Sequence, residues 1–398
     1  MDCEDRKALL AMVASSKVWR RAALPILYRV VRLSTTSAMT RLHHIFDVDP
    51  GLVKFVHEVQ FKIPPGGDAQ HQALCMGLTH CLSAHSLRPQ ILHLHNLTDI
   101  DREALGKSLV FGEGEAMVPV VADVRQLKMT SCTFRFFTGF QNVLNAFPRL
   151  EDLTLDAVSF ETAKPTFSNR RPVRLRRLTV GRHCDIKTIL SWCLRITGDE
   201  VRLLTSIALQ SLGTGDLDNG GLSSLGFLRQ QTRDLTLGLN LIDVPKPFLH
   251  ALQGPLNLST FSSINVLRLR LLDLQPHSLR WVTPLLYTLV QSGSNSCSCC
   301  VWGMPSRSIT TLIFDVWLFN AYQLQIDEWD NIIMALSALS TKKLPFYPGE
   351  AMKASLRKIV FVQRGPLDIF RARETIKRRL GFLDSANTVN VEVIPPEA

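Results

Sequence analysis

A six-residue phrase of the form Leu-x-x-Leu-x-Leu returns along this chain and constrains its fold more than any other feature. Its clearest copy is Leu150–Leu155, and related copies occupy residues 175–180, 264–269, 309–314 and 356–361, with looser ones at 91–95, 124–129 and 231–237. With the fourth position as anchor, Leu127 to Leu153 is 26 residues and Leu153 to Leu178 is 25. Self-similarity at this period predicts a solenoid of repeats, each packing on its neighbours.

The spacing between phrases also predicts how the strands pair. Leu178 to Ile207 is 29 residues and Ile207 to Leu235 is 28, and later steps lengthen to 45 and 47. Every step leaves room for the crossover that parallel pairing requires. We therefore expect one parallel sheet containing the strands centred on Leu127, Leu153, Leu178, Leu235, Leu267, Leu312 and Ile359.

Helical spacing of apolar residues appears between these phrases, at 137–147, 185–193, 222–230 and 327–339. Residues 4–28 predict two helices, with an N-cap at Ser15-Ser16 and an end or kink at Pro25. A strand at 27–33, a helix at 40–46 and a strand at 56–63 follow, and a helix at 366–383 leads into a final strand at 388–393. The expected fold class is α/β, a leucine-rich-repeat-like solenoid over 29–398 with a capping helix and strand at 366–393, preceded by a short helical segment at 1–28.

Side-chain alternation along each strand separates a core face from an outward, concave face. The first, fourth and sixth residues of a phrase should be buried, and the third and fifth should point outward. The outward candidates for ligand contact are Lys128, Asp152, Thr154, Arg177, Thr179, Asp234, Thr236, Arg268 and Lys358, beside Gln126, Val266, Thr311, Ile313 and Val360. A mixed polar strip of this kind suits a protein ligand.

Charge and composition exclude several classes of protein. The 398 residues carry a formal net charge of +10, but the Lys and Arg residues are spread along the chain without a nucleic-acid-binding motif. No apolar run is long enough to span a membrane. The charged N-terminus lacks a signal-peptide core, and nine mostly isolated cysteines indicate reduced thiols. We expect a cytoplasmic or nuclear protein with no membrane contact and no nucleic-acid ligand.

The motifs in this sequence that could indicate catalysis or metal binding are incomplete. Cys297-Ser-Cys299-Cys300 has zinc-knuckle spacing without a second ligand pair, so a solvent-near loop is favoured over metal binding or redox sensitivity. His93-Leu-His95 has the spacing of metal-dependent barrel hydrolases but lacks an acidic pattern on later strands. The glycine clusters at 111–115 and 213–221 fit neither a phosphate loop nor a calcium loop. We predict no catalysis, no cofactor and no metal, with a metal hydrolase on an α/β barrel as a disfavoured alternative.

The N-terminal sequence supports a resemblance to a known protein family. The stretches Leu9–Arg20 and Ala23–Leu33 resemble the second half of an F-box and its exit strand, in the style of the F-box/leucine-rich-repeat proteins of mushroom-forming fungi. The resemblance implies a substrate receptor of an SCF-type, cullin-based ubiquitin ligase, whose F-box docks the adaptor subunit. The residues it offers for adaptor docking are Leu9, Leu10, Val13, Trp19 and Leu24.

One departure from the F-box pattern lowers the expected affinity. The Leu-Pro-x-Glu-Leu helix that opens an F-box does not precede Ala11 in this sequence. We therefore expect weak or no adaptor binding, with Trp19 packed inward and the face of Leu9, Leu10 and Val13 folded back as a cap on the repeats. A stand-alone repeat scaffold without a ligase link is the alternative.

Overall fold

The computed structural model describes residues 3–64, 77–78, 80–97, 121–162, 174–196, 204–218, 222–240, 244–261, 263–271, 279–291, 309–341, 356–385 and 389–396. The chain divides into two compact units, Met1–Asp185 and Ile186–Ala398. The cysteine cluster at 297–300 and most of the two long loops of the later repeats lie outside the described residues.

The strands form a large parallel sheet, as the phrase spacing predicts. The twelve described strands follow the order β1-β2-β3-β4-β6-β8-β9-β10-β11-β12-β13-β14, so neighbours in the sheet are neighbours along the chain. Each pairing with a defined register within this sheet is parallel. The mixed α/β class and the parallel sheet are therefore confirmed.

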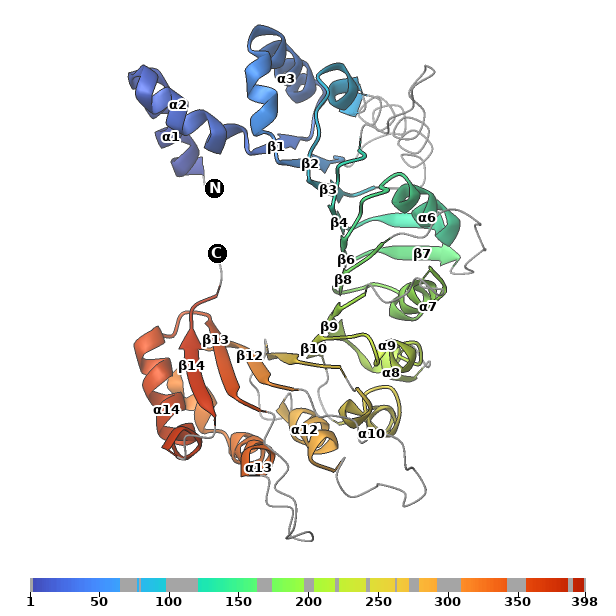
Figure 1. The fold of residues 1–398 in the computed structure, drawn as a ribbon, viewed down its shortest axis with the longest axis vertical. Helices are drawn as coiled ribbons and strands as arrows, with labels where there is room; N and C mark the ends of the chain where they lie inside the picture. Colours follow the sequence, from blue (N-terminus) through green and yellow to red (C-terminus); the bar gives the residue numbers. More distant parts are fainter. Residues whose placement is uncertain are drawn as a thin grey trace. The chain divides into compact units, whose positions relative to one another are not determined.

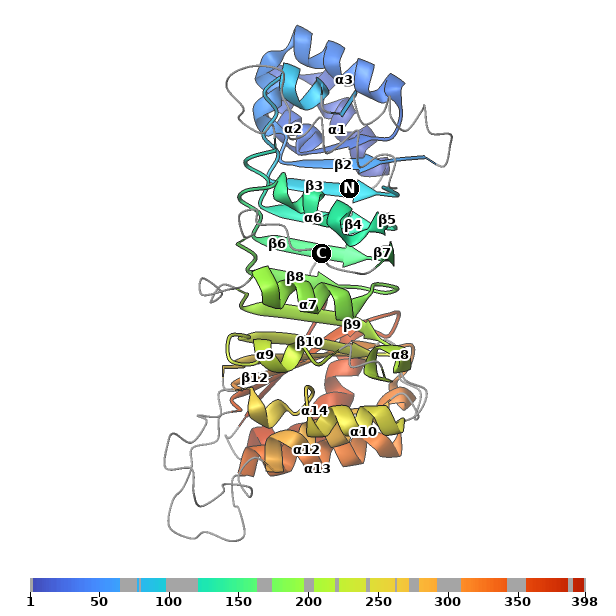
Figure 2. The same ribbon diagram turned by 90° about the vertical axis from the view of Figure 1, so that its right-hand side faces the viewer.

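Unit 1 holds the first six of these strands. They are β1 (Val30–Leu33), β2 (Glu58–Lys62), β3 (Ile91–His95), β4 (Gln126–Thr130), β6 (Asp152–Asp156) and β8 (Arg177–Val180). Its described helices are α1 (Cys3–Ser15), α2 (Lys17–Tyr28), α3 (Thr36–Val48), η1 (Pro50–Phe55) and α6 (Phe137–Asn145). The helices α3 and α6 cover one side of the strand row, while α1 and α2 lie beyond its β1 end (Figures 1 and 2).

Unit 2 holds the remaining strands with helices packed on one side of them (Figure 1). The strands are β9 (Ser206–Leu212), β10 (Asp234–Leu239), β11 (Val266–Leu271), β12 (Thr311–Trp317), β13 (Lys358–Arg364) and β14 (Asn390–Ile394). The described helices are α7 (Ile186–Ile196), α8 (Thr214–Asp218), α9 (Leu225–Leu228), α10 (Lys246–Gln253), η2 (Leu258–Thr260), α12 (Val282–Gln291), η3 (Ala321–Gln325), α13 (Asp327–Thr341) and α14 (Ile369–Ser385).

The core forms where the repeated phrase places its apolar positions. In the copy at 150–155, Leu150, Leu153 and Leu155 are at most 1% exposed, and the matching positions of the other well-conserved copies are also buried, apart from the half-buried Ile309. Burying a leucine side chain contributes about 1.5–3 kcal/mol, so the three apolar positions of each phrase stabilise the fold by several kcal/mol.

A second, two-stranded parallel sheet was not predicted. Its strands β5 (Thr133–Phe136) and β7 (Ser159–Thr162) follow β4 and β6 at the same offset. Phe134 and Phe160 stack at 6.1 Å between ring centroids, and Phe137 and Phe140 of α6 pack on Phe160. The two short strands thus carry an aromatic core beside the leucine core of the main sheet.

Left-handed turns mark the end of four successive strands in unit 1. Asn96, Ser131, Ala157 and His183 each have φ between 51° and 59°. Three of their amides donate to the next repeat: Asn96 N to the Thr130 carbonyl at 3.0 Å, Ser131 N to that of Asp156 at 2.9 Å, and Ala157 N to that of Arg182 at 2.7 Å. We call these bonds the turn ladder, which joins adjacent repeats outside the sheet.

The expected start of the first strand was wrong. The helix α2 continues through Pro25 to Tyr28, and β1 begins only at Val30. An interior proline removes one helical hydrogen bond. Here packing outweighs that loss, because Ala23 is buried and the Tyr28 ring lies 6.4 Å from that of Phe46 in α3. The N-cap prediction was correct, since the Ser16 side chain accepts a hydrogen bond from the Trp19 amide.

Two further expectations differ from the structure. The helix predicted at 222–230 is reduced to α9, with turns on either side. Val360, expected to point outward to solvent, is only 5% exposed. It lies in register between Ile313 of β12 and Glu392 of β14, so long side chains from both neighbouring strands flank it.

Candidate functional site

The outward side of the unit 1 sheet carries most of the predicted ligand-contact residues. Strands β3, β4 and β6 all alternate between half-buried and buried residues. The buried members point into the core, so the half-buried ones share the opposite side of the sheet. We call this side the polar face of unit 1.

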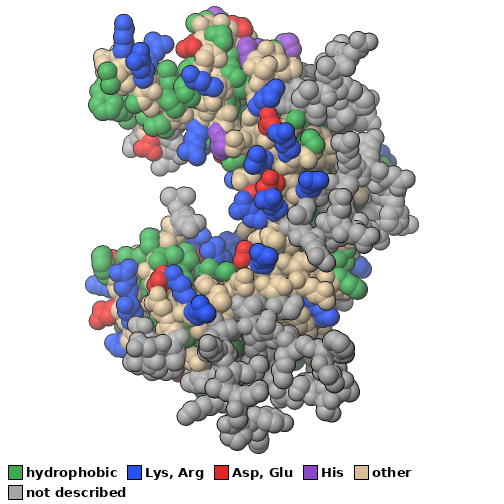
Figure 3. Space-filling view, viewed as in Figure 1, with side chains coloured by type: hydrophobic (Ala, Val, Ile, Leu, Met, Phe, Trp, Pro, Cys, Tyr) green, Lys and Arg blue, Asp and Glu red, His purple; other side chains and the backbone are tan. Residues whose placement is uncertain are grey.

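The parallel register arranges the polar face in rows that run across the strands. One row contains Gln60, His93, Lys128, Thr154 and Thr179, and a second contains Glu58, Ile91, Gln126, Asp152 and Arg177. Lys128, Asp152, Thr154, Arg177 and Thr179, which lie up to 51 residues apart in sequence, are therefore brought together. Figure 3 shows basic side chains (blue) interspersed with acidic ones (red) over these strands.

Arg177 and Asp152 neutralise each other within the polar face. The guanidinium donates to both carboxylate oxygens, with Nε–Oδ1 at 2.7 Å and the second pair at 2.5 Å. This hydrogen bonding raises the pKa of Arg177 above its ordinary value. The pair is a bidentate contact between adjacent strands, and it leaves the neighbouring Lys128 with no ion-pair partner among the described residues.

The two histidines of β3 lie on the polar face of unit 1. Their rings are tilted by 37° with centroids 3.7 Å apart, and His93 Nε2 lies 3.0 Å from Thr130 Oγ1. Burial lowers the pKa of His93 to about 4, helped by the nearby charges of His95 and Lys128. His93 is therefore neutral at pH 7 and serves as a hydrogen-bonding group.

The predicted residues of unit 2 form a separate polar surface on that unit. Asp234 pairs in register with Val266, and Thr236 with Arg268, so three of the candidates lie on adjacent strands. Burial raises the pKa of Asp234 above its usual range. Lys358 contacts Glu392 of β14 at 2.7 Å. The candidates of unit 2 thus include one ion-paired side chain, Lys358, and three polar side chains on two adjacent strands.

Sequence reasoning missed a charged cluster on the same side of the unit 2 sheet. Asp315 is 2% exposed, and its carboxylate lies 2.6 Å from Arg364 Nε and 3.8 Å from Arg270 Nε. Arg270 and Asp315 are opposite each other in register. Side-chain alternation places the third and fifth residues of a phrase on the outward side, and it places the seventh residue there too. The prediction stopped at the fifth residue and therefore omitted this cluster.

The predicted adaptor-docking residues lie on the hairpin of α1 and α2. Leu10 is 53% exposed and Trp19 is 51% exposed, while Leu9, Val13 and Leu24 are half-buried. The inward packing expected for Trp19 is therefore wrong, because Ala23 rather than Trp19 is the buried residue of α2. Together with Val18, which is 77% exposed, Leu10 and Trp19 leave apolar surface on the hairpin.

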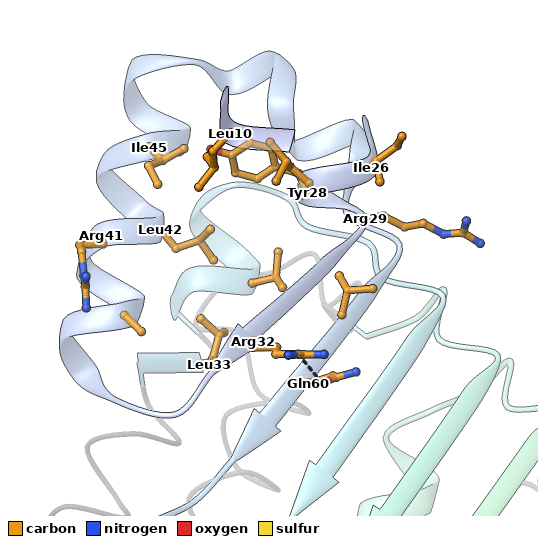
Figure 4. A pocket seen from close by; sticks show the side chains of 14 residues that line it. Leu10, Ile26, Tyr28, Arg29, Arg32, Leu33, Arg41, Leu42, Ile45 and Gln60 are labelled. Carbon is orange, nitrogen blue, oxygen red and sulfur yellow. Dashed lines mark hydrogen bonds between the residues drawn. The ribbon is translucent and has the colours of Figure 1, made fainter. Parts of the chain in front are cut away.

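The expected capping role of α1 is also not what the structure shows. Helix α1 packs mainly on α2, and α2 in turn contacts η1 and β1. The side chain of Leu10 borders an open groove of about 650 Å³ between the hairpin, β1 and α3 (Figure 4). The groove is lined by Leu10, Ile26, Leu27, Tyr28, Arg29, Val30, Val31, Arg32, Leu33, Ala38, Arg41, Leu42, Ile45 and Gln60. We call it the edge groove.

The part of the chain that the structure describes contains neither a metal-ion cluster nor a transmembrane helix. No group of three or more His, Cys, Asp or Glu side chains among them is arranged to hold a metal ion. None of the helices in the described ranges has the length and apolar character needed to cross a bilayer. No known protein family, curated protein or solved structure matches this chain.

Proposed function

We propose that this chain is a protein-recognition module, built as a leucine-rich-repeat-like solenoid, that binds a protein ligand on the polar faces of its sheet. The observation that carries the proposal is the register of the parallel strands, which turns one repeated phrase into rows of exposed polar side chains. Repeat proteins use such extended surfaces for binding. The turn ladder supports the solenoid, because it repeats the same hydrogen bond between successive repeats.

The composition of the faces suits a protein ligand better than a small molecule. Small-molecule sites are concave and mostly apolar, whereas the rows alternate Lys, Arg, Asp, Thr and Gln side chains. Interfaces of this kind gain specificity from charge matching and affinity from a few anchors. Lys128 and Arg268 are the strongest candidates for charged anchors, since no described residue forms an ion pair with either of them.

We further propose that the ligand is a substrate presented to an SCF-type ubiquitin ligase, with the α1–α2 hairpin as the adaptor-docking element. The exposed apolar side chains of Leu10, Val18 and Trp19 support this role, because monomeric proteins seldom leave such residues grouped without a partner. The resemblance of Leu9–Leu33 to part of an F-box points to the same element. No catalysis by the chain itself is part of this proposal.

Calorimetry with the purified adaptor subunit tests the ligase link. We expect binding in the micromolar range or weaker, and a further loss of about tenfold or more in V18D and W19A, because each removes apolar contact area. Lys187→Glu, an exposed charge reversal on α7, is the matched control. Nanomolar binding would contradict the expected weak docking, and no binding at all would favour the stand-alone scaffold.

Cross-linking mass spectrometry in cells tests the recognition role itself. A ligand bound on the polar faces should cross-link to the native chain and be lost in a Lys128→Glu, Arg268→Glu double variant, while K187E retains it. A ligand captured equally by all three chains would refute the assignment of the polar faces as the binding surface.

A further inference from the structure

The strand β1 has a free edge. It stands at the end of the strand order and pairs only with β2 among the described strands. The Arg29 carbonyl accepts the Glu58 amide of β2 at 2.9 Å. In a parallel pair alternate residues face the same neighbour, so the backbone groups of Val30 and Arg32 point to the free edge. Their N–H and C=O groups form a template for another strand.

Apolar side chains line the space beside this edge. The edge groove is walled by Leu10 and Tyr28 on the hairpin side and by Leu42 and Ile45 of α3 on the other, with β1 along its base (Figure 4). Leu10 and Ile26 are each more than half exposed. A strand added to β1 would place every second side chain into this groove and the others on the opposite side, with the polar face.

The positive charge around the edge groove indicates what kind of added strand would bind there. Arg29, Arg32 and Arg41 are all exposed, and no Asp or Glu is among the lining residues. Arg32 lies on the polar-face side of β1, where its Nε donates to Gln60 at 3.0 Å and the rest of the guanidinium is solvent-accessible. Glu58 is linked to Arg32 through Gln60 but is not among the residues that line the groove. A carboxylate on the added strand would therefore meet a net positive charge.

We propose that the edge groove binds an extended segment of a partner protein in which aliphatic residues alternate with Asp or Glu, and that the segment pairs with β1 as an additional strand. Its aliphatic side chains pack into the groove against Tyr28, Leu42 and Ile45. Its carboxylates face Arg32 and the arginines at the rim. This site adjoins the polar face of unit 1 at Arg32 and includes Leu10, but it does not include the exposed residues Val18 and Trp19 of the hairpin.

A second copy of the chain is a poorer occupant than an acidic segment. Pairing two β1 strands edge to edge would bring Arg32 of one copy beside the basic groove of the other. Like charges across neighbouring strands are destabilising. The added strand must therefore differ from β1 in charge.

Fluorescence polarisation with synthetic peptides tests the proposal on the full chain. The probe is a short labelled peptide that alternates valine and glutamate, compared with one that alternates valine and lysine. We expect the acidic peptide to bind about tenfold or more tightly than the basic one. The same acidic peptide with N-methylated backbone amides should not bind, because strand addition depends on main-chain hydrogen bonds.

Two variants separate edge pairing from general charge attraction. Val30→Pro removes the free-edge N–H, and proline is tolerated on an edge strand in that orientation. Because proline disfavours the helical backbone of the residue before it, and Arg29 has φ −57° and ψ −38°, the N-methylated peptide with the native chain is the independent test of edge pairing. V30P should abolish binding, and Arg32→Glu should weaken it about tenfold or more, whereas K187E should bind as the native chain does. Circular dichroism confirms that each variant is folded.

Four results would overturn the proposal: no binding of the acidic peptide, equal binding of both peptides, full binding by V30P, or full binding by the N-methylated peptide. Self-association of the chain that V30P abolishes would assign the edge to a second copy and would also overturn it. Adaptor binding, measured independently with V18D and W19A, is unaffected by any of these outcomes, so the two proposals fail separately.

Discussion

At the scale of single residues, Gly365 shows how one backbone position can fix a strand end. It has φ of +91°, and an added Cβ would lie 2.6 Å from the Leu318 carbonyl oxygen and 3.0 Å from Trp317 Nε1. Only glycine adopts this conformation without strain. The position joins the end of β13 to the segment that leads into α14.

We expect Gly365→Ala to lower the free energy of unfolding by about 2 kcal/mol, from backbone strain and the clash with Leu318. The matched control is Gly381→Ala in α14, where an added Cβ meets nothing within 4 Å. That change should stabilise the chain by about 0.5–1 kcal/mol, because alanine is the better helix former. Urea denaturation of both variants measures the difference, and equal stabilities would contradict the assignment of strain to residue 365.

The polar face also carries a residue whose titration affects stability. The pKa of His93 is about 4 in the folded chain, below the value of about 6.5 for an unperturbed histidine. The unfolded state therefore binds the proton more readily, and stability is lost as the pH falls from about 6.5 towards 4. Because His93 is only half-buried, solvent screening limits the loss to about 1–2 kcal/mol.

His93→Gln should remove this part of the acid sensitivity. We expect the stability difference between pH 7 and pH 5 to shrink in H93Q relative to the native chain, as measured by urea denaturation at each pH. The change His250→Gln removes an exposed histidine of α10 and serves as the control. An unchanged pH dependence in H93Q would show that His93 titrates near its ordinary value.

At the scale of elements, two ion pairs on adjacent strands allow a direct comparison of burial. The side chain of Asp315 is 3% exposed, and its partners Arg270 and Arg364 are 20% and 34% exposed. In the other pair Asp152 is 15% exposed, but Arg177, the charge that its removal would leave, is 62% exposed. Removing one partner of a buried pair leaves an uncompensated charge out of water. Exposed pairs lose little, because water and salt already screen them.

We expect Asp315→Ala to cost about 3 kcal/mol and Asp152→Ala less than about 1 kcal/mol in the free energy of unfolding. Thermal and urea denaturation in low and high salt check both values. Similar losses in the two variants would mean that the Asp315 cluster is hydrated in solution.

The elements that the sequence predicted most accurately are the strands that contain the repeated phrase. The strand phrase placed β3, β4, β6, β8 and β10 to β13 to within about three residues, because burial of Leu and Ile at fixed positions decides both the strand and its register. The start of β1 could not be predicted, since the packing of Tyr28 on Phe46 is a tertiary contact. The strands β5 and β7 were missed, although Phe134 and Phe160 each lie seven residues after an anchor leucine.

The polar faces were partly predictable for the same reason. Alternation alone assigned Asp152, Thr154, Arg177 and Thr179 to one side, and register in the sheet then placed them together. The edge groove was not predictable, because it arises where the hairpin, β1 and α3 meet. Contacts among three elements are tertiary, so no local sequence pattern predicts them.

At the scale of the whole molecule, we expect the purified chain to carry no stoichiometric zinc or iron. The His93–His95 pair lacks further ligands among the described residues, and the motif at Cys297 offers too few for a closed zinc site. Elemental analysis of protein prepared without chelators and without an affinity tag measures this directly. About one metal ion per chain would revive the hydrolase alternative.

The turn ladder has a consequence for how the chain is made. Each of the three amides in the turn ladder donates to a carbonyl that is synthesised later: Asn96 N to that of Thr130, Ser131 N to that of Asp156, and Ala157 N to that of Arg182. On the ribosome, the turn amide of a newly emerged repeat therefore lacks its protein acceptor until its successor appears, roughly one to seven seconds later at ordinary elongation rates. Each new repeat completes the one before it, so translation and assembly of this unit run in the same direction.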